Sequence, residues 1–361
     1  MKHHLFIGTW TPPGAIFTIT FDDHTHKLEL LQRTPIPQDE PISWLTLSHN
    51  RTQIYGASMK KWSSHAITTP SEITHSASLP MGGDPSANDA TTKTRAIFIL
   101  AAHKPPYCVY GNPFYDHAGY INVHSVNEDG SLAQNIQNAP LDPTSAVHGM
   151  AFDAEEEYLY SADMWANKIW THKKDPKTGH LTLISSLPAP DPHDHPRWLA
   201  LHPSGTHLYV LMETTNRLCI YTLSRTTHTP TYTQQTYPLI PPDFNTFHPK
   251  MYRSDVVTVS ASGKYLFATA RSNSPHLTGY MSVFGLGEKG EVERQLCLNP
   301  TVTSGGHSNA VAPCPWSDEW VALTDDEKGF VEVYRWKDEW LGRVAHLDVQ
   351  EPGFGMNAAW Y

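Results

Sequence analysis

The chain has 361 residues and a formal net charge of -10 at pH 7 with histidine neutral. This excess of negative charge argues against a nucleic-acid partner, and an anionic ligand would need a local positive pocket. No apolar run approaches the roughly 20 residues of a membrane-spanning helix, so we expect no membrane partner.

The N-terminal segment and the cysteines predict a cellular compartment. The first residues, MKHHLFIGTWTPP, lack the long apolar region of a signal peptide. The four cysteines, Cys108, Cys219, Cys297 and Cys314, show no paired spacing. We therefore expect a cytoplasmic protein with free, mostly buried thiols.

The first part of the chain is predicted to form strands separated by polar connections. Residues 3–9 and 16–21 are apolar, strand-like runs. Residues 43–47 and 54–59 are predicted to form a hairpin around the polar segment SHNRTQ. Residues 63–94 are polar and rich in Pro, Gly and Ser, so we expect a loop or insertion there, with a lid as the alternative.

Two further segments interrupt the strand-like runs. Residues 104–119, KPPYCVYGNPFYDHAG, are aromatic-rich and could form a tunnel wall or a contact between the subunits of a homo-oligomer. Residues 226–252 are predicted to form another long polar connection. We predict no helix.

Residues 197–212 give the strongest local prediction, a β-hairpin. Two short apolar runs flank HPSGT, which is typical of a turn because Pro fixes φ and Gly accepts a left-handed backbone. Arg197 opens the first strand, and Glu213 closes the second. Since antiparallel strands place the start of one beside the end of the other, we expect Arg197 and Glu213 to share one edge of the sheet.

The same hairpin recurs along the chain, with starts near residues 43, 95, 148, 197, 254 and 307. A period of roughly 50 residues is typical of a β-propeller with one blade per repeat. Residues 356–361 resemble a first strand without a following partner, and the N-terminal runs lack a preceding one. We therefore predict an all-β, seven-bladed β-propeller, a single domain over residues 1–361, with a closing blade built from both termini.

Two short motifs suggest a cofactor or a metal, and both have a simpler interpretation. Residues 285–290, GLGEKG, fit a dinucleotide-binding loop, but a strand-like run follows where a helix is required, so we predict a hairpin turn. Residues 191–195, DPHDH, bring His and Asp close together, but we interpret them as the loop that leads into Arg197. We predict no metal site.

Charged and imidazole side chains are predicted to meet at one mouth of the propeller channel. First strands line that channel, and their starts lie beside the ends of the second strands. Alignment of the repeats places five residues near that mouth: His148, Arg197, Glu213, Arg271 and His307. Any one of them alone would have a structural role, but together they predict a polar site in a concave, partly dry tunnel.

Eight segments carry a resemblance to a known family and extend over nearly the whole chain. They are HHLFIGTWTPPGAIFT (3–18), IPQDEPISW (36–44), KKWSS (60–64), HGMAFD (148–153), APDPHDHPRW (189–198), TSGGHSNAV (303–311), PCPWSDEW (313–320) and EPGFGMNAAWY (351–361). In these segments the chain resembles the fungal 3-carboxy-cis,cis-muconate cyclases, the 3-carboxymuconate lactonizing enzymes of the seven-bladed propeller lactonase superfamily. The resemblance implies that the proposed active-site residues of the family correspond to His148, Arg197, Glu213 and Arg271.

The resemblance implies an intramolecular lyase, or cycloisomerase, reaction. One carboxylate of 3-carboxy-cis,cis-muconate adds to a conjugated double bond and forms 3-carboxymuconolactone, in the protocatechuate branch of the β-ketoadipate pathway of aromatic-acid catabolism. The nucleophile is already ionised, so we expect the enzyme to need no cofactor. The protein must fold the diene, hold a tricarboxylate and donate a proton to the neighbouring carbon.

The candidate residues can be matched to these tasks. Arg197 and Arg271 suit the carboxylates because a guanidinium stays charged and binds a carboxylate at two points. Lys60 or Lys61 could add a third positive group, and His307 is a further candidate for substrate binding.

The proton donor is expected to be Glu213 or His148, with the other residue orienting the substrate. Burial can hold a proton on Glu near neutral pH, and His carries one intrinsically. We favour Glu213 as the general acid.

Two other functions remain open for this sequence. The first is a lactone hydrolase of the same fold, such as a 6-phosphogluconolactonase, which would need an activated water and a phosphate pocket. The second is a protein-binding platform of the WD-repeat type, although the blades lack the regular Gly-His and Trp-Asp signatures. The long matching segments favour the cyclase.

Overall fold

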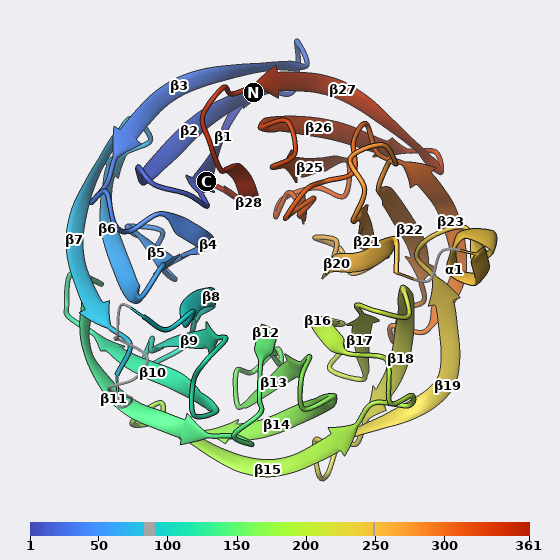
Figure 1. The fold of residues 1–361 in the computed structure, drawn as a ribbon, viewed down its shortest axis with the longest axis horizontal. Helices are drawn as coiled ribbons and strands as arrows, with labels where there is room; N and C mark the ends of the chain where they lie inside the picture. Colours follow the sequence, from blue (N-terminus) through green and yellow to red (C-terminus); the bar gives the residue numbers. More distant parts are fainter. Residues whose placement is uncertain (83–90, 248–249) are drawn as a thin grey trace.

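The protein is built from seven four-stranded antiparallel sheets around a central channel (Figure 1). The computed structural model describes residues 1–82, 91–247 and 250–361. Each sheet is one blade, and its strands follow one another in sequence order outward from the channel. The predicted all-β, seven-bladed propeller is therefore confirmed.

In each blade the first strand lines the channel and the second strand packs behind it. The first strands are β28 (Phe354–Trp360), β4 (Ile42–Leu47), β8 (Arg95–Ala101), β12 (Val147–Phe152), β16 (Pro196–Leu201), β20 (Tyr252–Val259) and β24 (Val311–Pro313). The second strands are β1 (Lys2–Thr9), β5 (Gln53–Ser58), β9 (Val109–Phe114), β13 (Tyr158–Asp163), β17 (His207–Met212), β21 (Tyr265–Ser272) and β25 (Trp320–Asp325).

The third and fourth strands form the outer part of each blade. The third strands are β2 (Ala15–Asp22), β6 (Lys61–Thr69), β10 (Tyr120–Val126), β14 (Lys168–Lys174), β18 (Arg217–Leu223), β22 (Tyr280–Leu286) and β26 (Phe330–Lys337). The fourth strands are β3 (Lys27–Pro35), β7 (Glu72–Pro80), β11 (Leu132–Pro140), β15 (Leu181–Pro188), β19 (Pro230–Pro238), β23 (Val292–Pro300) and β27 (Trp340–Asp348).

The two ends of the chain meet in one blade, as the sequence predicts. Strand β28 is the innermost strand of the sheet that continues with β1, β2 and β3. The antiparallel register places Leu5 opposite Trp360 and Ile7 opposite Ala358. Figure 1 shows the N- and C-termini side by side in this blade. Main-chain hydrogen bonds between residues from opposite ends of the chain therefore close the ring.

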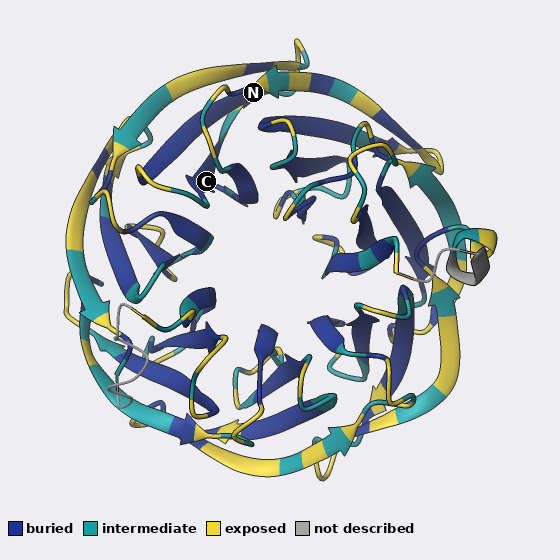
Figure 2. Cartoon of the chain, in the orientation of Figure 1, coloured by how far each residue is buried: buried dark blue, intermediate teal, exposed yellow. Residues whose placement is uncertain are grey.

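Burial is greatest in the second strands and least in the fourth strands, and it explains the sequence pattern of each strand. Strands β5 and β9 are buried along their whole length, because neighbouring blades cover both of their faces. The fourth strands are mostly exposed or half-buried, as Figure 2 shows for the outer ring. Inner strands are thus continuous apolar runs, whereas outer strands are rich in polar side chains.

Two predicted polar connections are instead outer strands, so those predictions are wrong. Residues 63–94 include most of β6 and all of β7, and residues 83–90 of this segment lie outside the described residues. Residues 226–252 contain β19 and the six-residue helix α1 (Pro242–Phe247), although we predicted no helix. Fourth strands have one face in solvent, so their Ser, Thr and Gln content resembles that of a loop.

The predicted hairpin starts agree with the first strands in five blades. The sixth start, predicted near residue 307, is observed at Val311. The chain before it forms a loop in which Gly305 and Gly306 have φ of 91° and 61°. These left-handed conformations are readily accessible to glycine and delay the start of the strand.

The described residues agree with the predicted thiol chemistry. All four cysteines are free, and three of them are buried. No helix in the described ranges has the length and apolar character needed to cross a membrane.

Candidate active site

One mouth of the channel holds a small cavity with a volume of about 250 Å³. Starts of first strands and ends of second strands surround it, as the repeat alignment predicts. The residues of the cavity wall include His148, Arg197, Glu213, Arg271 and His307. The structure therefore brings together all five residues that were predicted to meet at this mouth.

An irregularity in strand pairing repeats at this mouth. The register between the first and second strands shifts in six blades. In five of them the shifts skip Ser43, Ile97, His148, Arg197 and Asp255 with Val256. In the closing blade the skipped residues of β28 include Met356. All of these named residues line the cavity. A β-bulge bends its strand and re-aims a side chain, so the repeated bulge presents one or two residues of each blade to the cavity.

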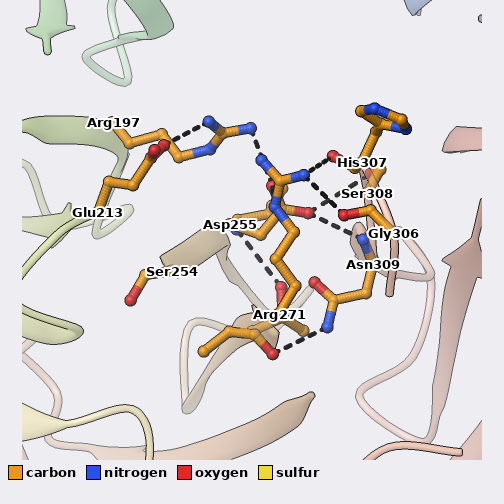
Figure 3. Close-up of polar contacts among 12 residues, drawn as sticks. Arg197, Glu213, Ser254, Asp255, Arg271, Gly306, His307, Ser308 and Asn309 are labelled. Atoms are coloured by element: carbon orange, nitrogen blue, oxygen red, sulfur yellow. Dashed lines mark hydrogen bonds and ion pairs between the residues drawn. The ribbon is translucent and has the colours of Figure 1, made fainter. Parts of the chain in front are cut away.

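Arg197 lies between two carboxylates at the centre of the site (Figure 3). Its Nη1 donates to Oε2 of Glu213 at 2.5 Å, and its Nη2 donates to Oδ1 of Asp255 at 3.0 Å. Strand β16 starts beside the end of β17, which is the shared edge predicted for Arg197 and Glu213. Burial alone would lower the pKa of Arg197, but the charges of Glu213 and Asp255 outweigh it and raise that pKa.

Asp255 is a site residue that the sequence analysis missed. Its carboxylate also forms an ion pair with Nε of Arg271 at 3.4 Å (Figure 3). It accepts a hydrogen bond from the backbone N–H of Asn309 at 2.9 Å. Burial would raise the pKa of Asp255, but Arg271 and Arg197 outweigh it and hold that pKa below its usual value. Asp255 therefore stays ionised and fixes both guanidinium groups.

Arg271 is held by the main chain as well as by Asp255. Its Nη1 donates to the carbonyl of Gly306 at 3.0 Å and also to the carbonyl of His307 (Figure 3). Burial lowers the pKa of Arg271 to about 10, so the group remains a cation near neutral pH.

A third arginine, Arg253, lines the same cavity and was also missed. It lies opposite Arg271 in the register of β20 with β21. A repeat alignment that begins at the first residue of β20 would have found it, because Arg253 is the second residue of that strand and Arg197 is the second residue of β16.

His148 is a buried, neutral imidazole on the wall of the site. Burial lowers its pKa well below the usual value, and the positive charges of Arg197 and Arg271 lower it further. Its Nδ1 has no hydrogen-bond partner among the described residues. Phe114 and Trp198 contact the ring, with centroid distances of 5.5 Å and 6.0 Å.

The remaining predicted binding residues lie at the edge of the cavity or away from it. His307 lines the rim, where its Nδ1 is 3.0 Å from Asp326. Lys61 forms ion pairs with Asp39 and Glu40, and Nζ of Lys60 donates to Thr92. Neither lysine is among the residues that line the cavity. Arg253, and not a lysine, supplies the third positive group of the wall.

An aromatic layer closes the bottom of the cavity. The rings of Trp44 and Trp198 have centroids 4.4 Å apart, and Phe98 meets Trp198 edge-on at 4.9 Å. Trp44 and Trp198 also line a larger chamber of about 740 Å³ on the other side of this layer. These aromatic rings therefore lie between the site and the larger chamber.

The polar groups of the cavity suit an anion better than a cation. Three arginines face it together with two carboxylates, Glu213 and Asp255, so the fixed charges sum to +1. Among the described residues, no group of three or more His, Cys, Asp or Glu side chains could hold a metal ion. The arrangement can bind carboxylates and offers one imidazole and one carboxyl group for proton transfer.

Comparisons with known proteins place the chain in a family. Residues 4–337 match the model of the family described as "Lactonase, 7-bladed beta-propeller". The chain is 58% identical over 363 residues to carboxy-cis,cis-muconate cyclase of Neurospora crassa, which covers 99% of both chains. It is 25% identical over 357 residues to muconate cycloisomerase 1 of Cutaneotrichosporon cutaneum, covering 92% of this chain and 90% of that protein.

A solved structure supports the same assignment at the level of the fold. The periplasmic gluconolactonase of Pseudomonas aeruginosa superimposes with a TM-score of 0.79 at 16% identity, covering 100% of this chain and 99% of that one. Such low identity shows a shared fold and not a shared reaction. The chain therefore belongs to the seven-bladed β-propeller lactonase family.

Proposed function

We propose that this protein is a cycloisomerase that converts 3-carboxy-cis,cis-muconate to 3-carboxymuconolactone. The observation that carries the proposal is the cavity itself, in whose wall Arg197, Arg253 and Arg271 lie with the neutral imidazole of His148. The near-full-length similarity to the Neurospora crassa cyclase supports the same reaction.

The reaction needs a site that holds a trianion and keeps its chain folded. Arginines bind carboxylates through paired hydrogen bonds, and a buried position strengthens that attraction. The cavity of about 250 Å³, bordered by the rings of Trp44 and Trp198, can hold a short tricarboxylate whose cis double bonds already bend its chain. A bent diene brings one carboxylate oxygen close to the carbon that it attacks.

The chemical step is an addition that consumes one proton. The carboxylate oxygen forms a C–O bond to one carbon of the double bond, and the π electrons move to the neighbouring carbon. That carbon takes a proton from an acid of the site and forms a C–H bond. Solvent then returns a proton to the acid, so each turnover removes one proton from the medium.

We assign proton donation to His148 and give Glu213 an orienting role, which reverses the preference from the sequence. Arg197 holds Glu213 at 2.5 Å in an ion pair that fixes the position of its carboxylate. Burial and, to a smaller extent, the nearby arginines lower the pKa of His148, so its imidazole is neutral before the substrate binds. A bound trianion would offset the charges of those arginines, which favours the protonated imidazole.

The direction of proton flow distinguishes this reaction from the rival hydrolase. Purified, EDTA-treated protein would be mixed with 3-carboxy-cis,cis-muconate in a weakly buffered solution. The cyclase must consume protons as the ultraviolet absorbance of the diene is lost. Hydrolysis of a lactone, tested with 6-phosphogluconolactone, must release protons. Inactivity on the first substrate together with proton release on the second would replace the cyclase with the hydrolase.

The cellular context remains part of this proposal. We place the reaction in aromatic-acid catabolism, in the protocatechuate branch of the β-ketoadipate pathway, and without a cofactor. A cytoplasmic location is supported by the four free cysteines, since disulfides are rare in a reducing compartment. A homo-oligomer is also part of the proposal, and sedimentation of the purified protein would test it.

A further inference from the structure

Arg253 differs from the other two arginines of the cavity in its partners. Arg197 is paired with Glu213 and Asp255, and Arg271 is paired with Asp255 and with two main-chain carbonyls. Arg253 forms no ion pair with any described residue, and its buried Nε has no hydrogen-bond partner there. The uncompensated positive charge of the pocket therefore belongs to Arg253.

The position of Arg253 places its charge close to a second arginine. It lies directly opposite Arg271 across two paired strands, and like charges on facing residues repel each other. The repulsion is also felt by Arg271, whose pKa is lowered first by burial and then by Arg197 and Arg253 in spite of Asp255. A cation kept unpaired beside two others is explained most simply by an anionic group of the ligand.

We propose that Arg253 binds the third carboxylate of the substrate and thereby selects tricarboxylates over dicarboxylates. The inference rests on the proposed function, because cyclisation itself requires only the attacking carboxylate and the conjugated acid that it adds to. A dicarboxylate would satisfy the paired arginines and leave Arg253 without a partner. The third carboxylate of a tricarboxylate could accept two parallel hydrogen bonds from the planar guanidinium of Arg253.

Binding measurements with two unreactive acids test this selection. cis-Aconitate and glutaconate share a five-carbon unsaturated diacid backbone and differ by one carboxylate. Their affinities would be measured by calorimetry at one fixed ionic strength on the wild type, Arg253→Gln and Arg253→Lys. Arg225→Gln is the matched control, because Arg225 is an exposed arginine in the turn after β18 and its loss changes the net charge equally.

We expect Arg253→Gln to weaken cis-aconitate binding by about tenfold or more and glutaconate binding by less than about threefold, the cost of losing one charged hydrogen-bonded contact. Arg253→Lys keeps the positive charge but not the planar guanidinium, so its affinity for cis-aconitate should lie between those of the wild type and Arg253→Gln. Arg225→Gln should change neither affinity. Thermal unfolding of Arg253→Gln should occur at or above the wild-type temperature, because the substitution removes a repelling charge.

Two outcomes would overturn the inference. One is an equal loss of affinity for both acids, which would make Arg253 a general source of positive potential. The other is a wild type that does not prefer cis-aconitate. A wild type that fails to cyclise 3-carboxymuconate, yet keeps an Arg253-dependent preference for the tricarboxylate, would instead refute the proposed reaction and leave the role of Arg253 standing.

Discussion

The two chambers of the channel share the same first strands but differ in chemistry. The smaller chamber, about 250 Å³, is surrounded by Arg197, Arg253, Arg271, Glu213 and Asp255. The larger one, about 740 Å³, is lined mainly by apolar residues that follow one another along the first strands. One arginine and two histidines also line it. The aromatic layer of Trp44, Phe98 and Trp198 separates them.

The difference shows where a propeller can acquire a function. Around the larger chamber the first and second strands pair in regular register, and consecutive residues of the first strands line the wall. Around the smaller chamber, bulges in six blades turn skipped residues such as His148 and Arg197 into the cavity. A bulge frees a residue from the ladder, so the side chain at such a position can differ between blades while the strands behind it stay paired.

The largest expected effect is on kcat, and it should follow the loss of the histidine in the smaller chamber but not the loss of one in the larger chamber. His148→Asn should lower kcat by about 10²- to 10⁴-fold, because general acid catalysis is lost. The matched variant, His103→Asn, removes an exposed histidine from the wall of the larger chamber and should leave kcat unchanged. Steady-state rates of diene loss would be compared. A His148→Asn enzyme with wild-type kcat would remove His148 from the proton transfer.

The second comparison concerns buried and exposed arginines. Arg197→Gln should destabilise the fold by about 3–5 kcal/mol, because it removes the cation shared by the buried Asp255 and the half-buried Glu213. Arg51 in the larger chamber is exposed, donates a hydrogen bond to the carbonyl of Trp360 and lies over the ring of Tyr361, so Arg51→Gln should cost about 1 kcal/mol or less. Urea unfolding of both variants gives the free energies. Equal midpoints would mean that the ion-pair network of the smaller chamber is not structural.

These two comparisons also show how far sequence reasoning extends. Hairpin ends located His148, Arg197, Glu213 and Arg271, because charges at strand ends are visible once the repeat is aligned. Asp255 was missed because a lone Asp within an apolar run gives no signal until a bulge is assumed at its position.

The lysines and the outer strands show a second limit. Lys60 and Lys61 were placed at the mouth from their position after β5, but the turn directs them to Thr92 and to the carboxylates of Asp39 and Glu40. The polar outer strands β7 and β19 were mistaken for connections. The direction of the lysine side chains and the pairing of the outer strands both depend on residues that are distant in the sequence. A short sequence pattern does not contain that information.

The third test removes the boundary between the chambers. Trp198→Ala should cost about 3 kcal/mol of stability, because it empties the centre of the aromatic layer. It should also lower activity by letting water reach the site from the larger chamber. Trp340→Ala is the control, since Trp340 is 60% exposed and should change stability by about 0.5 kcal/mol or less. Unaltered stability of Trp198→Ala would show that the layer is not packed as described.

The smallest expected effect lies in the blades, away from both chambers. Burial lowers the pKa of His124 in β10 to about 3, so the unfolded chain binds more protons below pH 6.5. Stability is therefore fully present above pH 6.5 and is lost as the pH falls, by about 2 kcal/mol between pH 7 and pH 5 for this residue.

A substitution isolates this contribution. His124→Leu should show about 2 kcal/mol less loss of unfolding free energy than the wild type over the same pH interval. His24→Leu, at an exposed turn, is the control and should follow the wild type. An unchanged pH dependence in His124→Leu would mean that the burial of His124 does not contribute to the loss of stability in acid.

The joining of β28 to β1 has a consequence for the order in which the protein matures. These strands are encoded at opposite ends of the sequence, so their pairing is the least local contact in the molecule and is expected to form late. Strand β28 also carries Met356, which lines the cavity and whose carbonyl accepts a hydrogen bond from Ser308. The last step of folding is therefore also the step that completes the pocket. A nascent chain still lacking β28 would hold six blades and an unfinished site, so the enzyme would become active only when its ring closes.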